Sequence, residues 1–295
     1  MKITAKELSK LVKKGLKGTK GRGIKIIDGS WFMPASGIDA LKIYKSDHVP
    51  TAKFFDIDTV AEKDDMPHTW PTENTFNKEC KKLGIRPEDD LIIYDQKGLF
   101  SAARVYYLFK FHGHQGKLSI LEGGLPAYRQ ERTAKEDIEL EKTIKEEKDD
   151  DEETTTTYKV AKDHLISLKD LLKALEEKER PFKIVDARSE GRFNGTEPEP
   201  RPIKSGHMPG AINVPFTDVL VQDGSQLKSK EELLAYFKQK DLKQDEPIVA
   251  SCGSGVTACV IMYALENAGY QNLALYDGSW SEYAVQPLVV IEEQL

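Results

Sequence analysis

The sequence predicts an α/β protein made of two tandem copies of one plan, each a mainly parallel sheet with helices on both faces. Three observations predict this. The chain has 295 residues, enough for two domains of about 100–200 residues each. Short apolar runs rich in Ile and Val alternate with stretches of helical spacing. Sequence patterns also recur at separations of 155 to 159 residues, far longer than the repeat of a solenoid.

The internal repeat can be followed through four pairs of segments. In chain order these are 26–28 with 184–186, 48–52 with 207–211, 91–95 with 248–252, and 121–128 with 276–283. A nearly constant separation over that length indicates a duplicated domain. We therefore expect a first domain at 1–130 and a second at 158–295.

Four apolar runs of the second copy have the length of buried strands, at 183–186, 211–214, 247–251 and 272–275. Helical spacing separates them at 168–177, 230–238 and 256–268, and the first copy has similar stretches at 5–16 and 75–83. Strands covered on both faces are apolar throughout, as in parallel sheets. Because ligands bind beyond the carboxyl ends of such strands, the strand-to-helix loops are where a site is expected.

An acidic segment at 131–157 separates the two copies and is expected to be a linker, since it has few apolar residues to bury. It holds 12 acidic and 5 basic residues, a net charge of −7, whereas the whole chain has −6. The remainder is therefore close to neutral. Without a basic field on the protein, we expect no binding to nucleic acid.

Composition also bears on the compartment. The sequence has no apolar run of about 18 residues, so no transmembrane helix is expected. The first 25 residues carry nine Lys or Arg and one acid, as a transit peptide could, but they are poor in Arg and Ser and fit an amphipathic helix. Three cysteines make no disulfide framework, and no metal-binding spacing occurs. We expect a reducing compartment, cytoplasmic or mitochondrial.

The loop after the 247–251 run combines a cysteine with an anion-binding backbone. Cys252 is followed by Gly-Ser-Gly, which lets the chain turn tightly with N–H groups pointing inward. The helix after it adds the positive end of its dipole. These surroundings favour a thiolate and then a persulfide, so Cys252 is the predicted nucleophile. The residues expected to bind the anionic groups are Gly253, Gly255, Val256 and Thr257.

The alternative for Cys252 is a small buried hydrophobe, as free cysteines often are, but a core cysteine would not precede Gly-Ser-Gly at a strand end. Cys259 lies among apolar residues and is expected in the core. Cys80 has no anion-binding loop and is expected to be inert. The matching loop of the first copy has Asp95 in place of the thiol, so that copy is expected to lack a nucleophile.

The run Cys-Gly-Ser-Gly-Val-Thr-Ala, inside two rhodanese-like copies, resembles the active-site loop of the 3-mercaptopyruvate sulfurtransferase family. The resemblance covers nearly all of the chain outside the linker and includes 28–34 (DGSWFMP), 191–201 (GRFNGTEPEPR), 206–211 (GHMPGA) and 276–280 (YDGSW). It implies two tandem rhodanese-like domains. It also implies transfer of sulfur from 3-mercaptopyruvate, through a persulfide, to a thiol such as thioredoxin or to cyanide, with release of pyruvate and without a metal or cofactor.

The residues after Cys252 can also be compared with those of related loops that have other functions. Thiosulfate sulfurtransferases carry basic residues where Gly253 and Ser254 stand here, and this alternative stays open. A sulfur-relay protein of tRNA thiolation would use the same persulfide and also stays open. Phosphatases of the broader fold need a Cys-x5-Arg loop, but the sixth residue after Cys252 is Ala258, which disfavours that chemistry.

By resemblance, Arg192 and Arg201 match the paired arginines that hold the substrate's carboxylate and carbonyl. The planar fork of arginine suits a carboxylate. The alternative is an ion pair of these arginines with Glu197 or Glu199. For Arg188 we expect a structural pairing role.

A proton relay is also implied by the resemblance. Ser254, His68 and Asp58 match the serine, histidine and acid that supply a proton to the enolate of pyruvate. The segment that carries the histidine is one residue shorter than usual, so Asp64 or Asp65 could take the place of Asp58.

Overall fold

The computed structural model describes residues 1–16, 22–62, 66–133, 135–139, 157–287 and 289–292, and it divides into two compact units. Unit 1 consists of Met1–Ala61, Pro71–Val160 and Gly224–Gln226. Unit 2 consists of Glu62–Trp70, Ala161–Asp223 and Leu227–Leu295. Each half of the sequence therefore forms one unit, except that a short segment of it joins the other. The segment Glu62–Trp70, which includes His68, is the one that joins unit 2.

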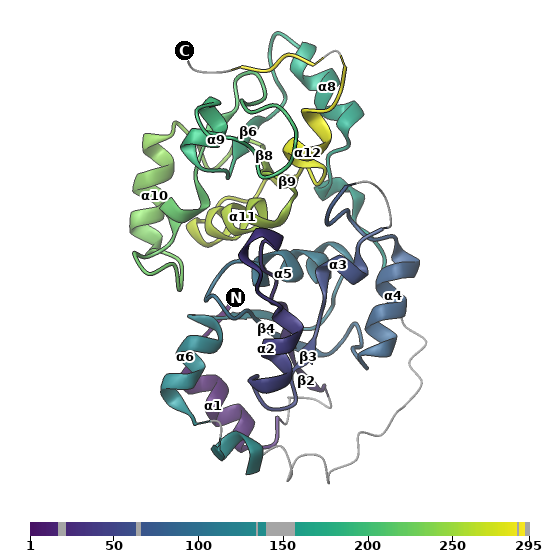
Figure 1. Ribbon diagram of the computed structural model, residues 1–295, viewed down its shortest axis with the longest axis vertical. Helices are drawn as coiled ribbons and strands as arrows, with labels where there is room; N and C mark the ends of the chain where they lie inside the picture. Colours follow the sequence, from purple (N-terminus) through teal and green to yellow (C-terminus); the bar gives the residue numbers. More distant parts are fainter. Residues whose placement is uncertain (17–21, 63–65, 134, 140–156, 288, 293–295) are drawn as a thin grey trace. The chain divides into compact units, whose positions relative to one another are not determined.

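Unit 1 is a five-stranded sheet in the order β1-β5-β4-β2-β3, and every strand pair in it is parallel (Figure 1). Its strands are β1 (Lys2–Ile3), β2 (Ile24–Asp28), β3 (Lys53–Phe54), β4 (Asp90–Tyr94) and β5 (Leu118–Leu121). Its helices include α1 (Ala5–Lys13), α2 (Ala40–Ser46), α3 (Ile57–Val60), α4 (Glu73–Lys82), α5 (Ala102–Phe111), α6 (Gly124–Glu131) and the short 3-10 helix η1 (Pro34–Ser36).

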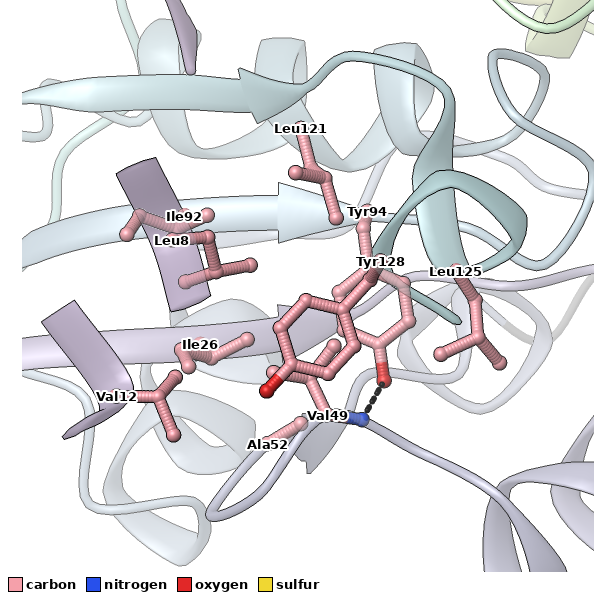
Figure 2. Packing of buried hydrophobic residues seen from close by; sticks show 10 residues of the cluster. All are labelled: Leu8, Val12, Ile26, Val49, Ala52, Ile92, Tyr94, Leu121, Leu125 and Tyr128. Carbon is pink, nitrogen blue, oxygen red and sulfur yellow. Dashed lines mark hydrogen bonds between the residues drawn. The ribbon is translucent and has the colours of Figure 1, made fainter. Parts of the chain in front are cut away.

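One face of this sheet packs against α1 and α6 (Figure 2). The core there consists of Leu8, Val12, Ile26, Val49, Ala52, Ile92, Tyr94, Leu121, Leu125 and Tyr128. The hydroxyl of Tyr94 accepts the N–H of Val49 at 3.2 Å, so the one polar atom of that side chain is satisfied. Leu91 and Ile93 alternate with these residues along β4 and are also buried, on the face that α5 covers.

Unit 2 repeats the plan with a four-stranded parallel sheet in the order β7-β6-β8-β9. Its strands are β6 (Lys183–Asp186), β7 (Ile212–Asn213), β8 (Ile248–Ser251) and β9 (Leu273–Leu275). Its helices include α8 (Leu168–Glu176), α9 (Glu190–Asn194), α10 (Lys230–Gln239), α11 (Val256–Ala268), α12 (Ser279–Tyr283), and the 3-10 helices η2 (Lys162–His164) and η3 (Phe216–Val219).

Both faces of the unit 2 sheet are covered. On one face Leu171 of α8 and Trp280 of α12 pack with Ile184 and Val249 of the two central strands. On the other face lies α11, which contacts β8 and β9 and is in turn contacted by α10. Ten of the thirteen residues of α11 are buried. A helix that packs against both the sheet and a second helix is expected to be apolar over most of its surface.

Local signals set where the helices begin. Thr4 and Glu7 form a capping box at the start of α1, and Ser229 and Glu232 form one at the start of α10. In each, the N-cap hydroxyl accepts a main-chain N–H of the first turn, and the glutamate carboxylate accepts the main-chain N–H of the N-cap residue. These exchanges satisfy donors that have no partner within the helix.

The predicted fold class is confirmed: both units are α/β, with parallel sheets and helices on both faces. The expected strand at 183–186 and helix at 256–268 coincide with β6 and α11. The expected strand at 211–214 is shorter, because only Ile212 and Asn213 pair with β6.

Most of the expected linker, at 134 and 140–156, lies outside the described residues. Its first part packs on unit 1. Asp137 is buried and accepts hydrogen bonds from Arg132 Nε at 2.6 Å and from the Tyr128 hydroxyl at 3.2 Å, and it pairs with Arg129. Nothing in the sequence of 131–157 distinguishes this buried carboxylate from the other acidic residues of the segment. In the structure Arg129 and Arg132 bind it.

The three cysteines are free and buried. In the part of the chain that the structure describes, no helix is long and apolar enough to cross a membrane.

A buried histidine of unit 1 gives a prediction about pH. The His114 ring lies 2.7 Å from the Asp89 carbonyl oxygen through Nε2, lies 3.1 Å from the Tyr158 hydroxyl through Nδ1, and stacks on Tyr158. Burial lowers the pKa of His114 from 6.5 to about 4. Since the unfolded chain then binds the proton more tightly, stability is full above about pH 6.5 and is lost as the pH falls toward 4.

We expect the free energy of unfolding of wild type to fall more between pH 7 and 5 than that of His114→Gln, by about 1 to 2 kcal/mol. Urea titrations at the two pH values measure this difference. Equal losses for wild type and His114→Gln would contradict the assignment.

Candidate active site

Cys252 lies where the sequence predicts a site, at the carboxyl end of the central strand β8 and before α11. It is 2% exposed, and Ser254 is also buried. Gly255 has a φ of 76° and makes the turn into α11. A left-handed residue at this point favours glycine, because a Cβ would clash with the backbone there.

The thiol loop is bound by Ser279, the first residue of α12. The Oγ of Ser279 accepts two main-chain hydrogen bonds, from the N–H of Cys252 and from that of Gly255, each at 3.1 Å. The same hydroxyl donates to the Tyr276 carbonyl at 3.0 Å. Ser279 is fully buried and has a φ of 52°. One side chain from 27 residues further on therefore joins both ends of the loop.

The first residues of α12 also hold the carbonyl groups of the loop. The N–H of Trp280 donates to the Cys252 carbonyl at 2.9 Å. The N–H and the hydroxyl of Ser281 both donate to the Gly253 carbonyl, at 3.0 and 2.6 Å. These two carbonyls therefore point toward α12.

The planarity of the peptide bond then fixes two N–H groups. In a trans peptide the N–H points away from the carbonyl of the residue before it. With the carbonyls of Cys252 and Gly253 turned to α12, the N–H groups of Gly253 and Ser254 point away from that helix. Within the described residues neither donates to a protein acceptor. They are the donors that an anion on the Cys252 side chain would use.

The matching loop of unit 1 shows what such a backbone binds. Asp95 follows β4 as Cys252 follows β8, and its carboxylate accepts four main-chain N–H groups at 2.7 to 2.9 Å. The donors are Lys97, Gly98, Phe100 and Ala102. Unit 1, whose loop has no cysteine, therefore uses the same strand-to-helix loop to bind an anion, and that anion is the Asp95 side chain of the loop itself.

Arg192 lies beside the thiol loop. A Cβ on Gly253 would be 2.9 Å from its Nη2 atom, so the guanidinium is in contact with the loop backbone. Its Nε and Nη2 donate to Glu199, at 3.2 and 2.5 Å. The ion pair with Glu199, weighed above as an alternative, is thus present, and it holds the guanidinium next to the loop.

Glu199 also binds Arg188, at 2.7 Å. Arg188 is fully buried, pairs with both carboxylate oxygens of Asp186 and lies over the Trp280 ring at 4.4 Å. Burial is the largest single influence and lowers the pKa of Arg188, but the charges of Asp186 and Glu199 and their hydrogen bonds together raise it above the ordinary value of arginine. Arg188 therefore has the structural role that the sequence predicts. Arg201 lies in the bend after Glu199 and is half-buried.

His68 belongs to unit 2, the unit that holds Cys252. It is 5% exposed and has a left-handed φ of 59°, which is uncommon for a residue other than glycine. Two residues on, the N–H of Trp70 donates to the Asp277 carboxylate at 2.6 Å. Asp277 is two residues before Ser279. The segment with His68 is therefore attached to the same turn that holds the thiol loop.

The acid predicted for the relay lies in unit 1. The carboxylate of Asp58 accepts the indole N–H of Trp31 at 2.9 Å, and the side chain is exposed. Asp64 and Asp65 lie outside the described residues. The structure thus groups Cys252, Ser254, Arg192, Arg201 and His68 in one unit and leaves Asp58 in the other.

A family model of the rhodanese-like domain matches this chain twice, over residues 4–131 and 167–286. This chain belongs to the two-domain rhodanese-like family. Among curated relatives, thiosulfate/3-mercaptopyruvate sulfurtransferase 1 of Arabidopsis thaliana, a mitochondrial protein, is 39% identical over 91% of this chain and 74% of its own length. The human 3-mercaptopyruvate sulfurtransferase is 36% identical over 92% of this chain and 90% of its own length.

A solved rhodanese-like structure agrees with both units. SseA of Escherichia coli, described as a 3-mercaptopyruvate sulfotransferase with the rhodanese fold, is 31% identical with a TM-score of 0.75. The similarity covers 95% of this chain and 99% of that one. The expected pair of rhodanese-like domains is thus confirmed.

Sequence reasoning missed Ser279 and Ser281 of this rhodanese-like chain. The motif at 276–280 is visible in the sequence, but nothing local shows that its serine reaches Cys252. One signal was available. In the aligned segments 121–128 and 276–283, Gly124 and Pro126 stand where Ser279 and Ser281 do. The copy with the cysteine has two hydroxyls that the copy without it lacks.

Proposed function

We propose that the chain transfers sulfur from 3-mercaptopyruvate to a thiol acceptor through a persulfide on Cys252. The observation that carries the proposal is the thiol itself, at the end of β8, in a loop whose Gly253 and Ser254 N–H groups point away from α12. Main-chain donors around a cysteine stabilise a thiolate. The names of the Arabidopsis and human relatives supply the donor.

In the first half-reaction the Cys252 thiolate attacks the sulfur of 3-mercaptopyruvate. A sulfur–sulfur bond forms and the carbon–sulfur bond breaks, and its electron pair stays on carbon as the enolate of pyruvate. The proton of the substrate thiol leaves the new persulfide, and one proton is delivered to the enolate carbon. The products are pyruvate and an anionic Cys252 persulfide, so charge and protons balance. This is nucleophilic catalysis through a covalent intermediate.

The substrate's own charges need cations and donors near the loop. Arg192 is proposed to bind the carboxylate, since its guanidinium already touches the loop at Gly253, and Arg201 to bind the carbonyl. Ser254 and His68 are proposed to carry the proton to the enolate, with Asp58 as their acid partner. Val256 and Thr257, at the start of α11, and the glycines of the loop are proposed to bind the anionic sulfur.

In the second half-reaction a thiolate acceptor attacks the outer sulfur of the persulfide. A new persulfide forms on the acceptor and the Cys252 thiolate leaves, which returns the enzyme to its starting state. A reduced dithiol protein such as thioredoxin or a small thiol can act as this nucleophile. Cyanide can attack the same sulfur, and its product is thiocyanate instead of a persulfide. No metal or organic cofactor takes part in the proposed steps.

Intact-mass measurement after addition of 3-mercaptopyruvate without an acceptor tests the proposal. We expect a gain of one sulfur atom per chain and an equal amount of pyruvate, because the persulfide cannot be discharged. A following addition of thioredoxin with its reductant should remove the sulfur. Pyruvate release with no gain in mass under these conditions would contradict a persulfide intermediate.

Thiosulfate is the second candidate donor, because the name of the Arabidopsis relative includes it. Comparison of kcat/KM for the two donors with one acceptor separates the two. We expect 3-mercaptopyruvate to be preferred, since Gly253 and Ser254 give the loop no cation for a doubly charged inorganic donor. A preference for thiosulfate would reverse the choice.

A further inference from the structure

The two serines of α12 bind the thiol loop at different atoms. Ser279 takes up the N–H groups of Cys252 and Gly255, at the ends of the loop. The hydroxyl of Ser281 adds a second bond to the Gly253 carbonyl, which its own N–H already holds. Neither side chain is exposed, and neither is part of the proposed chemistry.

Unit 1 shows that the turn folds without these hydroxyls. Gly124, which aligns with Ser279, has nearly the same left-handed φ, 56° against 52°. The N–H of Leu125 donates to the Asp95 carbonyl at 3.0 Å, as Trp280 donates to Cys252 at 2.9 Å. Pro126 aligns with Ser281 and has neither an N–H nor a hydroxyl. The backbone arrangement thus needs no serine at either place.

A serine at position 279 even has a cost. A left-handed residue other than glycine is strained by about 1 kcal/mol or more, and such strain persists where the surroundings hold it for a purpose. Ser279 bears the strain that Gly124 avoids. The gain in return is an oxygen that fixes two N–H groups of the thiol loop.

The difference between the two loops explains why the fixing is needed. In unit 1 the Asp95 carboxylate gathers the N–H groups of its own loop. Cys252 has no carboxylate, and in the proposed reaction its negative charge moves from the thiolate sulfur to the outer sulfur of the persulfide and back. The loop therefore needs bonds to other residues to keep its donors in one place, and preorganised donors are those that contribute most to catalysis.

We propose that Ser279 and Ser281 are positioning residues that keep the N–H groups of Gly253 and Ser254 turned away from α12 and available to the sulfur of Cys252. Because the Ser279 hydroxyl accepts the N–H groups of Cys252 and Gly255, these two groups do not compete with those of Gly253 and Ser254 for the Cys252 sulfur. Ser281 fixes the peptide group that carries the Ser254 N–H, because it binds the Gly253 carbonyl of that peptide. This inference rests on the proposed function for its catalytic readout.

The decisive variant is Ser279→Gly, which installs the residue of unit 1. We expect the melting temperature to change by only a few degrees, because relief of the left-handed strain offsets part of the loss of the bonds to the Cys252 and Gly255 N–H groups. We also expect kcat for 3-mercaptopyruvate to fall about 10- to 100-fold with little change in KM, because the arginines that bind the substrate are untouched. Alkylation of Cys252 by iodoacetamide at pH 7, followed by mass, should slow in parallel.

Ser281 offers a matched pair. Ser281→Ala removes the hydroxyl and should lower both rates, whereas Ser281→Thr keeps it and should restore them. Wild-type rates in Ser279→Gly and Ser281→Ala would overturn the proposal. Losses of kcat and of the alkylation rate that merely parallel a lower melting temperature would also overturn it, because they would show that the serines only stabilise the fold. If Ser279→Gly does not fold, the Ser281 pair decides by the same criteria.

Alkylation separates the failure of this inference from the failure of the proposed function. It needs no sulfur donor, so it reports on the loop even if 3-mercaptopyruvate is not the substrate. A wild type that forms no persulfide with this donor would remove the proposed function. The positioning inference would then stand or fall on the alkylation rates of Ser279→Gly and the Ser281 pair.

Discussion

Replacing Cys252 by serine is expected to abolish the release of pyruvate from 3-mercaptopyruvate, a loss of at least about 10³-fold. A hydroxyl ionises only at far higher pH than a thiol, so Cys252→Ser has no strong nucleophile at neutral pH. Its oxygen also cannot hold a sulfane sulfur for the second half-reaction. Pyruvate assayed by coupled oxidation of a nicotinamide cofactor measures the loss, and intact mass should show no added sulfur.

Cys259→Ser is the matched control for this experiment. Cys259 is fully buried on α11 and its thiol donates to the Gly255 carbonyl at 3.3 Å, a bond that a hydroxyl can also make. We expect this variant to keep most of the wild-type activity and to gain one sulfur atom. Turnover retained by Cys252→Ser would show that another group is the nucleophile.

Replacing Arg192 by lysine is expected to lower kcat/KM for 3-mercaptopyruvate about 100-fold. Nε and Nη2 of Arg192 bind Glu199, and within the described residues Nη1 donates no hydrogen bond. The guanidinium can therefore keep its anchor and still bind a substrate carboxylate, which a single ammonium cannot do. Hydrogen bonds to charged groups contribute about 1.5–3 kcal/mol each, which corresponds to this loss.

The effect of Arg192→Lys should appear mainly in KM, because a carboxylate is bound alike in the substrate and in the transition state. Arg180→Lys is the control. Arg180 lies before the amino end of β6, at the end of the sheet opposite to the one that Cys252 follows, and its guanidinium donates to the Pro209 carbonyl. Steady-state kinetics of the two variants decide the matter. An unchanged kcat/KM for Arg192→Lys would mean that its pair with Glu199 is structural only.

The sequence predicts the long, buried elements well and the short ones poorly. Ile184 and Val185 are apolar because β6 lies inside a parallel sheet, and α11 is apolar because it packs against both that sheet and α10. Elements such as β7, with two residues, or α9, with five, are too short for any periodicity to show. They form because their neighbours hold them, which no local pattern reports.

The same holds for the site. Cys252 and its loop are predictable, because glycines after a strand and a helix start after them are local signals. The bonds from Ser279 come from 27 residues further along the chain, and the left-handed φ that makes them possible depends on the folded turn. Nor does any local signal reveal that Glu62–Trp70 crosses to unit 2 and carries His68 with it.

The carboxylate of Asp95 has a further consequence for the stoichiometry of the protein. The Asp95 carboxylate is covalently part of the chain and cannot diffuse away, so the anion-binding loop of unit 1 is always occupied. We therefore expect that this loop does not compete for a soluble sulfur donor. The duplicated chain thus has two domains but only one strand-to-helix loop that is expected to carry sulfur. Each protein molecule is expected to bind one sulfane sulfur atom. A chemical assay of labile sulfur should therefore give one sulfur per chain and not two.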